Sequence, residues 1–404
     1  MDTPRSHETA EPTTRLETDI PSYRGDTLSA VTPSLAAALG VPGYEDLLDA
    51  GRVRGAAFLL VDGLGTRLLA RHAHLAPTLA ALAQRGSQLR SGFPATTATS
   101  LASLGTGLPA GGHGIVGMSF TADGFGDTEP CPALEALSWC AHTPEGSVDL
   151  RGQAPPESVQ PNATVFERAA ADGVEVSRVV PGFHHGSGLT RALLRGPGRF
   201  VAADAPDELV PGMLEALRVP GRALVYGYHG DLDAAGHVFG PGSEEWIEEL
   251  VRVEALVSDL ASDLPADSVL AVVADHGMVH TGEHRIDLDN SPELLRGVSR
   301  LSGEARVRHV HTEPGAAPEV LAAWREVLGE RAYVVERERA IAEGWYGAVS
   351  DRNRGRLGDV IAAARGDWTL LRPEAEPKQT SMIGHHGSWT ADEQLVPLLL
   401  LRPE

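Results

Sequence analysis

The stretch GAAFLLVDGLG, residues 55–65, decides the fold class. Its first part, residues 55–61, is almost wholly apolar, and Asp62 and a glycine follow at once. A continuous apolar run of this length predicts a strand that is buried on both faces, as in parallel sheets covered by helices. The polar residue after the run marks the carboxyl end of that strand. We therefore expect a sheet built around residues 55–61.

Similar short apolar runs recur along the 404-residue chain, at residues 174–180, 222–228, 268–274 and 395–401. Amphipathic stretches lie between them, at residues 76–86, 163–173 and 243–264. Strands that alternate with helical patterns are typical of α/β folds. The sequence thus predicts a mostly parallel central sheet flanked by helices.

One region interrupts this alternation and suggests a division of the chain. Residues 286–350 contain strand-like pieces around a helical pattern, which predicts a small inserted α+β lobe. The core then comprises residues 23–285 and 351–404. Residues 1–22 are polar and are expected to form a disordered tail.

Charge and hydropathy narrow the set of partners. The formal net charge of −21 disfavours a nucleic-acid polymer, because phosphate backbones are repelled by an acidic surface. The N-terminal segment lacks the apolar core of a signal peptide, and no apolar run approaches the roughly 20 residues of a membrane span. We therefore expect a soluble cytoplasmic protein without membrane contact, while the oligomeric state stays open.

Acidic and histidine residues follow several of the predicted strands. They comprise Asp62 after the first strand, Asp231, Asp233 and His237 after residues 222–228, Asp275 and His276 after residues 268–274, and His385 and His386 before the last strand. In open parallel sheets, ligands bind outside the carboxyl ends of the strands. Each residue alone is more often a helix cap, a turn residue or a surface group. Their joint occurrence at strand ends indicates one shared site.

Carboxylates that meet at one sheet edge repel each other, and a bound divalent cation usually neutralises their charge. Mixed aspartate and histidine ligands suit zinc better than magnesium or calcium. Asp233 and His237 are four residues apart, one helical turn, so that both can reach one ion. The ligands suffice for two metal ions, with Asp231 as a second-choice ligand.

A hydroxyl-rich stretch, SGFPATTATSLASLGTGLPAGGHGIVG at residues 91–117, adds a second feature. Such hydroxyl groups can belong to a solvated loop, cap a helix, or include a nucleophile. A threonine hydroxyl is a poor nucleophile unless a base, a charge or a metal activates it. The stretch therefore has to be considered together with the metal ligands.

The sequence as a whole resembles the type I phosphodiesterase/nucleotide pyrophosphatase branch of the alkaline phosphatase superfamily. The segments that carry the resemblance are LLVDGLG (59–65), FPATTATSLASLGTGLPAGGHGIVG (93–117), GDLDAAGHVFGP (230–241), VVADHGMV (272–279) and GHHGS (384–388). The resemblance implies an alkaline-phosphatase-like fold and two zinc ions, although other divalent metals are conceivable. One zinc would be held by Asp62, Asp275, His276 and the nucleophile, and the other by Asp233, His237 and His386.

The resemblance also implies which hydroxyl group attacks. Thr97 lies three residues after Pro94 and nine before the Thr106–Gly107 pair, which matches the family's threonine nucleophile. Ser100 stands where nucleotide pyrophosphatases of the family have an asparagine that contacts a phosphoryl oxygen, so Ser100 is expected to bind substrate.

The implied activity is hydrolysis of a small phosphorylated substrate, a nucleotide being one candidate, through a phosphothreonine intermediate. Alternatives on the same site are a phosphomonoesterase, a phosphonate hydrolase or a phosphomutase. A metal-binding protein without turnover is a further alternative from another class.

Overall fold

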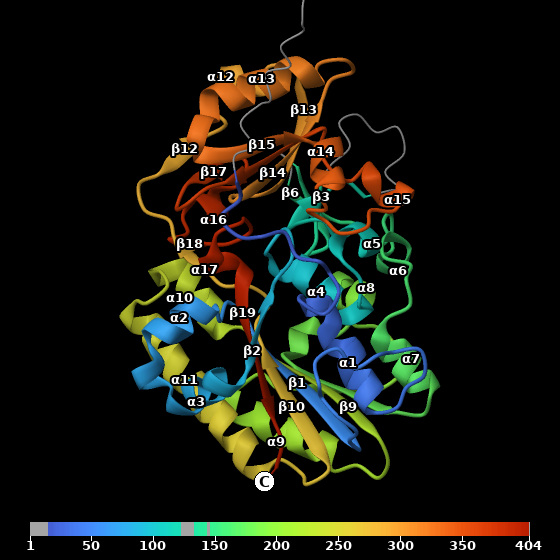
Figure 1. Ribbon diagram of the computed structural model, residues 1–404. Coiled ribbons are helices and arrows are strands. Elements are labelled where there is room, and N and C mark those ends of the chain that lie inside the picture. The colour runs from blue at the N-terminus through green and yellow to red at the C-terminus, as the bar shows by residue number, and fades with distance from the viewer. Residues whose placement is uncertain (1–14, 123–132, 144–145, 404) are drawn as a thin grey trace, which may run out of the picture.

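The computed structural model describes residues 15–122, 133–143 and 146–403, and its central element is the strand expected at residues 55–61 (Figure 1). This strand, β1 (Gly55–Val61), is buried along its whole length. It lies in the middle of a seven-stranded sheet with the order β2-β19-β10-β1-β9-β7-β8. The other members are β2 (Ser87–Arg90), β7 (Glu175–Val180), β8 (Arg199–Ala202), β9 (Ala223–His229), β10 (Ser268–Val273) and β19 (Leu395–Leu401).

The sheet is mostly parallel, which confirms the predicted fold class. Strands β10, β1, β9, β7 and β8 all run in one direction, whereas β19 pairs antiparallel with both β10 and β2. The register aligns Leu60 with Val273 and Val61 with His229. The carboxyl ends of β1, β9 and β10 therefore lie level with each other, at the same edge of the sheet.

Helices cover both faces of this sheet (Figure 1). One layer holds α2 (Thr66–Arg71), α3 (Pro77–Arg85), α9 (Pro206–Leu217), α10 (Asp231–Phe239) and α11 (Glu244–Asp263), and the other holds α1 (Val31–Ala38), α4 (Thr97–Thr106), α7 (Val165–Ala171) and α8 (Gly188–Leu193). The longest of them, α11, begins after Ser243, whose hydroxyl accepts a hydrogen bond from the Trp246 amide. Its buried residues recur at helical spacing, including Leu250, Val253 and Val257, so that a single apolar stripe faces the core.

The lobe is a four-stranded antiparallel sheet with the order β13-β14-β16-β15, covered by α12 (Pro292–Leu295) and α13 (Ala317–Leu328). Its strands are β13 (Val298–Glu304), β14 (Val307–Thr312), β15 (Ala332–Glu336) and β16 (Val360–Ala364). Strand β16 lies beyond the limit of residue 350 expected from the sequence. Its alanine-rich sequence predicts a strand only weakly, because alanine is uncommon in strands. The strand forms through backbone hydrogen bonds with β14 on one side and β15 on the other.

Smaller elements connect the sheet and the lobe. They are α5 (Ala110–His113), β3 (Ser119–Phe120), β4 (Leu134–Glu135), β5 (Cys140–Thr143), β6 (Gly146–Asp149), α6 (Pro156–Val159), β11 (Val279–His280), β12 (Arg285–Asp287), α14 (Arg337–Ala342), α15 (Asp351–Arg354), β17 (Thr369–Leu371), α16 (Pro377–Thr380), β18 (Gly384–His385) and α17 (Ala391–Gln394). The pairing of β11 with β18 brings residues 384–386 to the end of β10. In the portion of the chain that the structure describes, no helix has the length and apolar character needed to cross a membrane.

The expected disordered tail is only partly within the described residues, which begin at residue 15. The part that is described is packed against the protein: Thr18 is buried and its hydroxyl donates to the Trp389 carbonyl at 3.0 Å. Leu16 and Ile20 pack against the main apolar core. The expectation of disorder is therefore wrong for residues 15–22, because these two apolar side chains find a surface to cover.

Candidate metal centre and active site

The side chains expected at the strand ends come together at the carboxyl edge of the central sheet. Asp62 follows β1 directly, and Asp275 follows the end of β10 by two residues. The Gly63 amide donates to Asp275 Oδ1 at 3.1 Å, which ties the two strand ends to each other. Helix α10 starts just after β9 and carries Asp233 and His237 one turn apart, both on the same side.

A first group of side chains consists of Asp62, Asp275 and His276, whose ligand atoms all lie within 4.8 Å of one another. His276 Nε2 is 3.4 Å from Asp62 Oδ1 and 3.2 Å from Asp275 Oδ2. Thr97 Oγ1 is 3.1 Å from the same nitrogen. The structure thus places the predicted nucleophile against the residues predicted to hold the first ion.

A second group lies next to the first and contains Asp233, His237 and His386. His237 Nε2 is 3.3 Å from Asp233 Oδ2 and 3.2 Å from His386 Nε2. His386 Nε2 lies 3.9 Å from Asp233 Oδ1. The rings of His386 and His276 stack with their centroids 3.5 Å apart, so the two groups form one continuous site.

The three histidines are all held in the same way by backbone carbonyls. The Nδ1 atoms of His237, His276 and His386 lie 2.7, 3.0 and 3.0 Å from the carbonyls of Gly384, Gly277 and Ala95. Because a carbonyl oxygen can only accept, each Nδ1 donates, and each Nε2 directs a lone pair into the site. Carbonyl-anchored imidazoles of this kind are typical of metal ligands.

The carboxylates show a matching pattern of paired and unpaired oxygens. Asp62 Oδ2 accepts from the Tyr228 hydroxyl at 2.7 Å, and Asp275 Oδ1 accepts from the amides of Gly63 and His276. Asp62 Oδ1, Asp233 Oδ1 and Asp275 Oδ2 are buried and have no hydrogen-bond partner among the described residues. Buried oxygens without partners are costly unless a cation is bound.

Electrostatics point in the same direction. Burial raises the pKa of Asp62 well above its usual range, and the charges of Asp275 and Asp233 raise it further. Burial also raises the pKa of Asp233 and lowers that of His386 well below its ordinary value. Three carboxyl groups and three imidazoles thus crowd into one space, and divalent cations fit this donor set.

Thr97 is held at the amino-terminal end of α4, where it is the first helical residue. The Ala95 amide donates to the Gly387 carbonyl at 2.9 Å, which joins the loop before α4 to the loop that carries His386. The free amides and the dipole at this helix end favour negative charge on or near the Thr97 hydroxyl.

Ser100, which is expected to bind substrate, lies beside the first group of side chains. It is fully buried, and its hydroxyl donates to the Asp275 carbonyl at 2.8 Å, as that of Ser91 does at 2.6 Å. The Ser100 hydroxyl is therefore engaged with the backbone beside the site. Ser100 thus fixes the chain end that carries Asp275, and its expected contact with substrate stays a prediction.

Two further sequence candidates lie apart from the two groups. Asp231, the second-choice ligand, is exposed and lies near His229 and Glu249. His385 belongs to neither group, and burial lowers its pKa to about 3. The structure therefore brings together Asp62, Thr97, Asp233, His237, Asp275, His276 and His386, and leaves out these two.

A row of aromatic rings leads from the first group toward the surface. The Tyr228 hydroxyl bonds Asp62, the His184 ring lies 5.2 Å from that of Tyr228, and the Phe183 ring lies 4.4 Å from that of His184. Phe183 is 77% exposed, which is unusual for a large apolar side chain. No sequence pattern marks Phe183 or Tyr228 as functional, because neither stands in a motif.

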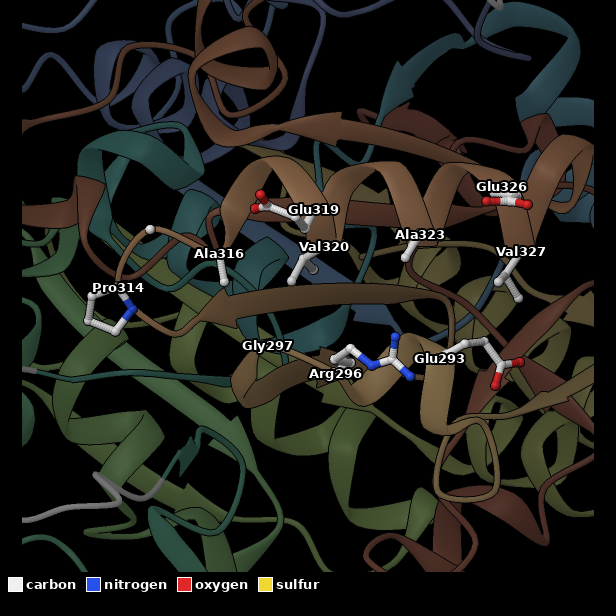
Figure 2. A pocket seen from close by; sticks show the side chains of 11 residues that line it. Glu293, Arg296, Gly297, Pro314, Ala316, Glu319, Val320, Ala323, Glu326 and Val327 are labelled. Atoms are coloured by element: carbon white, nitrogen blue, oxygen red, sulfur yellow. The ribbon is translucent and has the colours of Figure 1, made fainter.

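A groove elsewhere in the molecule holds none of the predicted site residues (Figure 2). It lies on the helical layer of the lobe, between α12 and α13, with Arg296 among the acidic residues Glu293, Glu319 and Glu326. Nothing in its lining resembles the donor set at the sheet edge.

Comparisons with known proteins agree with the fold. Murine ectonucleotide pyrophosphatase/phosphodiesterase 5, in an inactive form in complex with AMP, has a TM-score of 0.65 and 18% identity, over 86% of this chain and 88% of that one. Phosphonoacetate hydrolase from Sinorhizobium meliloti, in complex with phosphonoacetate, has a TM-score of 0.63 and 19% identity, over 87% and 91%. Both similarities establish the alkaline-phosphatase-like fold.

No curated protein sequence matches the chain. The profile of one family, described as Type I phosphodiesterase / nucleotide pyrophosphatase, matches residues 56–389. This range includes every residue of the two ligand groups and Thr97. The chain therefore belongs to the type I phosphodiesterase/nucleotide pyrophosphatase family, whose members hydrolyse phosphoester or phosphoanhydride bonds.

Proposed function

We propose that this protein is a metal-dependent phosphodiesterase or nucleotide pyrophosphatase that acts through a phosphothreonine intermediate at Thr97. One observation carries the proposal: three imidazoles and three carboxylate oxygens without hydrogen-bond partners among the described residues gather at one edge of the sheet, where the Thr97 hydroxyl lies 3.1 Å from His276 Nε2. His237 Nε2 and His386 Nε2 lie 3.2 Å apart, yet neither carries the proton needed for a hydrogen bond between them. A shared cation explains this close approach.

Two zinc ions suit the donor set. Asp62, Asp275, His276 and Thr97 would hold one, and Asp233, His237 and His386 the other. When bound, the pair supplies charge that favours the Thr97 alkoxide, neutralises the leaving oxygen and activates water. It would also let an acidic protein bind an anionic substrate, because the local positive charge opposes the net charge of −21.

The chain's own residues account for the chemical steps. Thr97 Oγ1 attacks phosphorus in line, the bond from phosphorus to the leaving oxygen breaks, and the threonine proton passes to solvent. Water then attacks the phosphothreonine, the bond to Oγ1 breaks, and Oγ1 regains a proton. The amino-terminal amides of α4 stabilise the negative charge on the phosphoryl group in both steps.

The aromatic row supports a substrate with a flat leaving group or esterifying group. Tyr228, His184 and Phe183 extend from Asp62 to the surface, and an exposed ring such as Phe183 can stack on a nucleobase. The structurally similar murine enzyme was solved with AMP, which is consistent with this reading. The similar phosphonoacetate hydrolase keeps phosphonate hydrolysis as a second candidate.

The test combines metal analysis, a substrate panel and a trap for the intermediate. Zinc-loaded wild type should hydrolyse bis-p-nitrophenyl phosphate and dinucleotide anhydrides faster than p-nitrophenyl phosphate or phosphonoacetate. Thr97→Ala should lose at least 1,000-fold in kcat while keeping its zinc, and Thr97→Ser should retain part of the activity.

A quenched single turnover of bis-p-nitrophenyl phosphate with wild type should leave a p-nitrophenyl phosphoryl group on Thr97, detected by peptide mass spectrometry. A wild type that binds two zinc ions and hydrolyses none of these substrates would show a metal-binding protein without turnover. Faster cleavage of phosphonoacetate than of any diester would favour the second candidate.

A further inference from the structure

A third set of ligand-type side chains lies outside the two groups at the sheet edge. It consists of His229, the last residue of β9, Asp231, the first residue of α10, and Glu249 on α11. One ligand atom from each lies within 4.8 Å of the other two, and His229 Nε2 is 3.7 Å from Glu249 Oε2. Three separate elements thus direct metal-ligand atoms at one point.

One atom of His229 and one of Glu249 are buried without a hydrogen-bond partner among the described residues. His229 is only 5% exposed, and its Nε2 makes no hydrogen bond within the described ranges. Glu249 Oε2 is also buried and has no hydrogen-bond partner among the described residues, because its 3.7 Å separation from His229 Nε2 is too long for a hydrogen bond. An imidazole nitrogen and a carboxylate oxygen that face each other without bonding leave a position for a ligand that both can reach.

The surroundings keep both groups available for such a ligand. Burial lowers the pKa of His229, an effect that the charge of Asp231 opposes and that of Arg252 reinforces. Arg252 pairs with Oε1 of Glu249, which orients the carboxylate and leaves Oε2 directed at His229. A hydrogen-bonded ion pair between His229 and Glu249 would need a separation shorter than the 3.7 Å observed.

We propose that His229, Asp231 and Glu249 form a third divalent cation site that is separate from the two-ion centre. One imidazole and two carboxylates suit a first-row transition metal such as Zn²⁺ or Mn²⁺, since Mg²⁺ and Ca²⁺ prefer oxygen ligands alone. Exposed Asp231 leaves the ion open to water on one side.

The position of this site suggests what the ion does. It joins the end of β9 to the start of α10 and to α11, and α10 carries Asp233 and His237. The His229 carbonyl also accepts from the Asp62 amide at 2.9 Å. The third ion therefore supports the segment that presents ligands to the two-ion centre, and it takes no part in the reaction.

Metal stoichiometry of the full chain tests the site. Wild type, stripped with chelator, reloaded with Zn²⁺ or Mn²⁺ and desalted, should contain three ions per chain by mass spectrometry of the metals. Asp231→Asn and Glu249→Gln should each contain two. Glu248→Gln is the matched control, because Glu248 is a neighbour on α11, is 69% exposed and also faces Arg252, and it should retain three.

A second measurement needs no variant that might misfold. Crystals of wild type soaked in Mn²⁺ should show an anomalous peak between His229 and Glu249. A wild type with two ions, or a crystal with peaks at the two-ion centre and none here, would overturn the proposal. Asp62→Asn combined with Asp233→Asn should retain this single peak, which separates failure of the third site from failure of the proposed catalytic function.

Discussion

The hydrogen bond from Tyr228 to Asp62 allows a sharp test of the metal-centre geometry. The hydroxyl of Tyr228 donates to Asp62 Oδ2 at 2.7 Å, and Oδ1 of the same carboxylate is left for an ion. Tyr226 lies two residues earlier on the same face of β9, is fully buried, and its hydroxyl has no partner among the described residues. Both Tyr228→Phe and Tyr226→Phe therefore remove a buried phenol oxygen, but only Tyr228→Phe also removes a hydrogen bond to Asp62.

The expected magnitude follows from the charge of Asp62 before and after metal binding. Burial raises the pKa of Asp62, so in the metal-free protein the Tyr228 hydroxyl faces a carboxyl group that tends to be neutral. A hydrogen bond to a neutral group contributes about 0.5–1.5 kcal/mol, and one to a charged group about 1.5–3 kcal/mol. Metal binding ionises Asp62 and so strengthens the bond by about 1–1.5 kcal/mol. Tyr228→Phe loses this gain, which corresponds to roughly a 5- to 13-fold higher Kd for zinc.

The assay is a competition titration of zinc against a chromophoric chelator, at pH 7 and constant ionic strength. Tyr226→Phe should bind zinc within twofold of wild type, because its hydroxyl contacts no ligand. The reasoning is refuted if Tyr228→Phe also stays within twofold, or if both variants lose affinity equally.

Three further predictions concern the substrate, the histidines and a buried acid. Phe183→Ala should raise KM for nucleotide-like esters roughly 2- to 13-fold, the value of one aromatic stacking contact, with kcat unchanged in steady-state assays. Burial lowers the pKa of His113 and of His311 to about 3 and that of His309 to about 4. Each histidine therefore contributes stability that is lost as the pH falls below about 6.5, by up to about 1.4 kcal/mol per pH unit. Urea unfolding at pH 7 and pH 5 should show this loss, and equal stabilities would contradict it. Burial raises the pKa of Glu304 to about 8, so its contribution to stability has the opposite pH dependence and is lost as the pH rises from about 4.5 to 8. Over that range the free energy of unfolding of Glu304→Gln should rise relative to that of wild type by up to about 1.4 kcal/mol per pH unit. Parallel pH profiles of the two proteins would disprove the shift.

Most of the candidate ligands could be located from the sequence because they follow strong strand signals, whereas His386 stands before the last strand. The apolar run at residues 55–61 predicts both a strand and the residue at which it ends. Asp62, which follows directly, must therefore lie at the carboxyl edge of the sheet. Edge strands gave no such signal: β2 and β8 contain Ser-Gln-Leu-Arg and Arg-Phe-Val-Ala, which are short and partly polar. Their strand conformation depends on neighbours that are distant in the chain.

The roles of single side chains were harder to predict than their neighbourhoods. Ser100 lies near the centre, as expected, but the rotation of α4 turns its hydroxyl to the Asp275 carbonyl. Asp231 stands two residues from Asp233 in the sequence. Because α10 begins at Asp231, both residues are helical, and side chains two positions apart on a helix point to different sides. Spacing predicts such outcomes only when the first residue of the helix is known.

The level strand ends of β1, β9 and β10 also have a consequence for assembly of the protein. The ligands enter from segments that are as far apart in sequence as Asp62 and His386, and His386 reaches its place only when β18 pairs with β11. In the proposed two-ion centre, a newly made chain could therefore not hold both ions until the segment with His386 has folded back onto the segment with Asp62. Metal capture would then be the final step of maturation, and a partly folded chain would be expected to release its ions to any competing chelator.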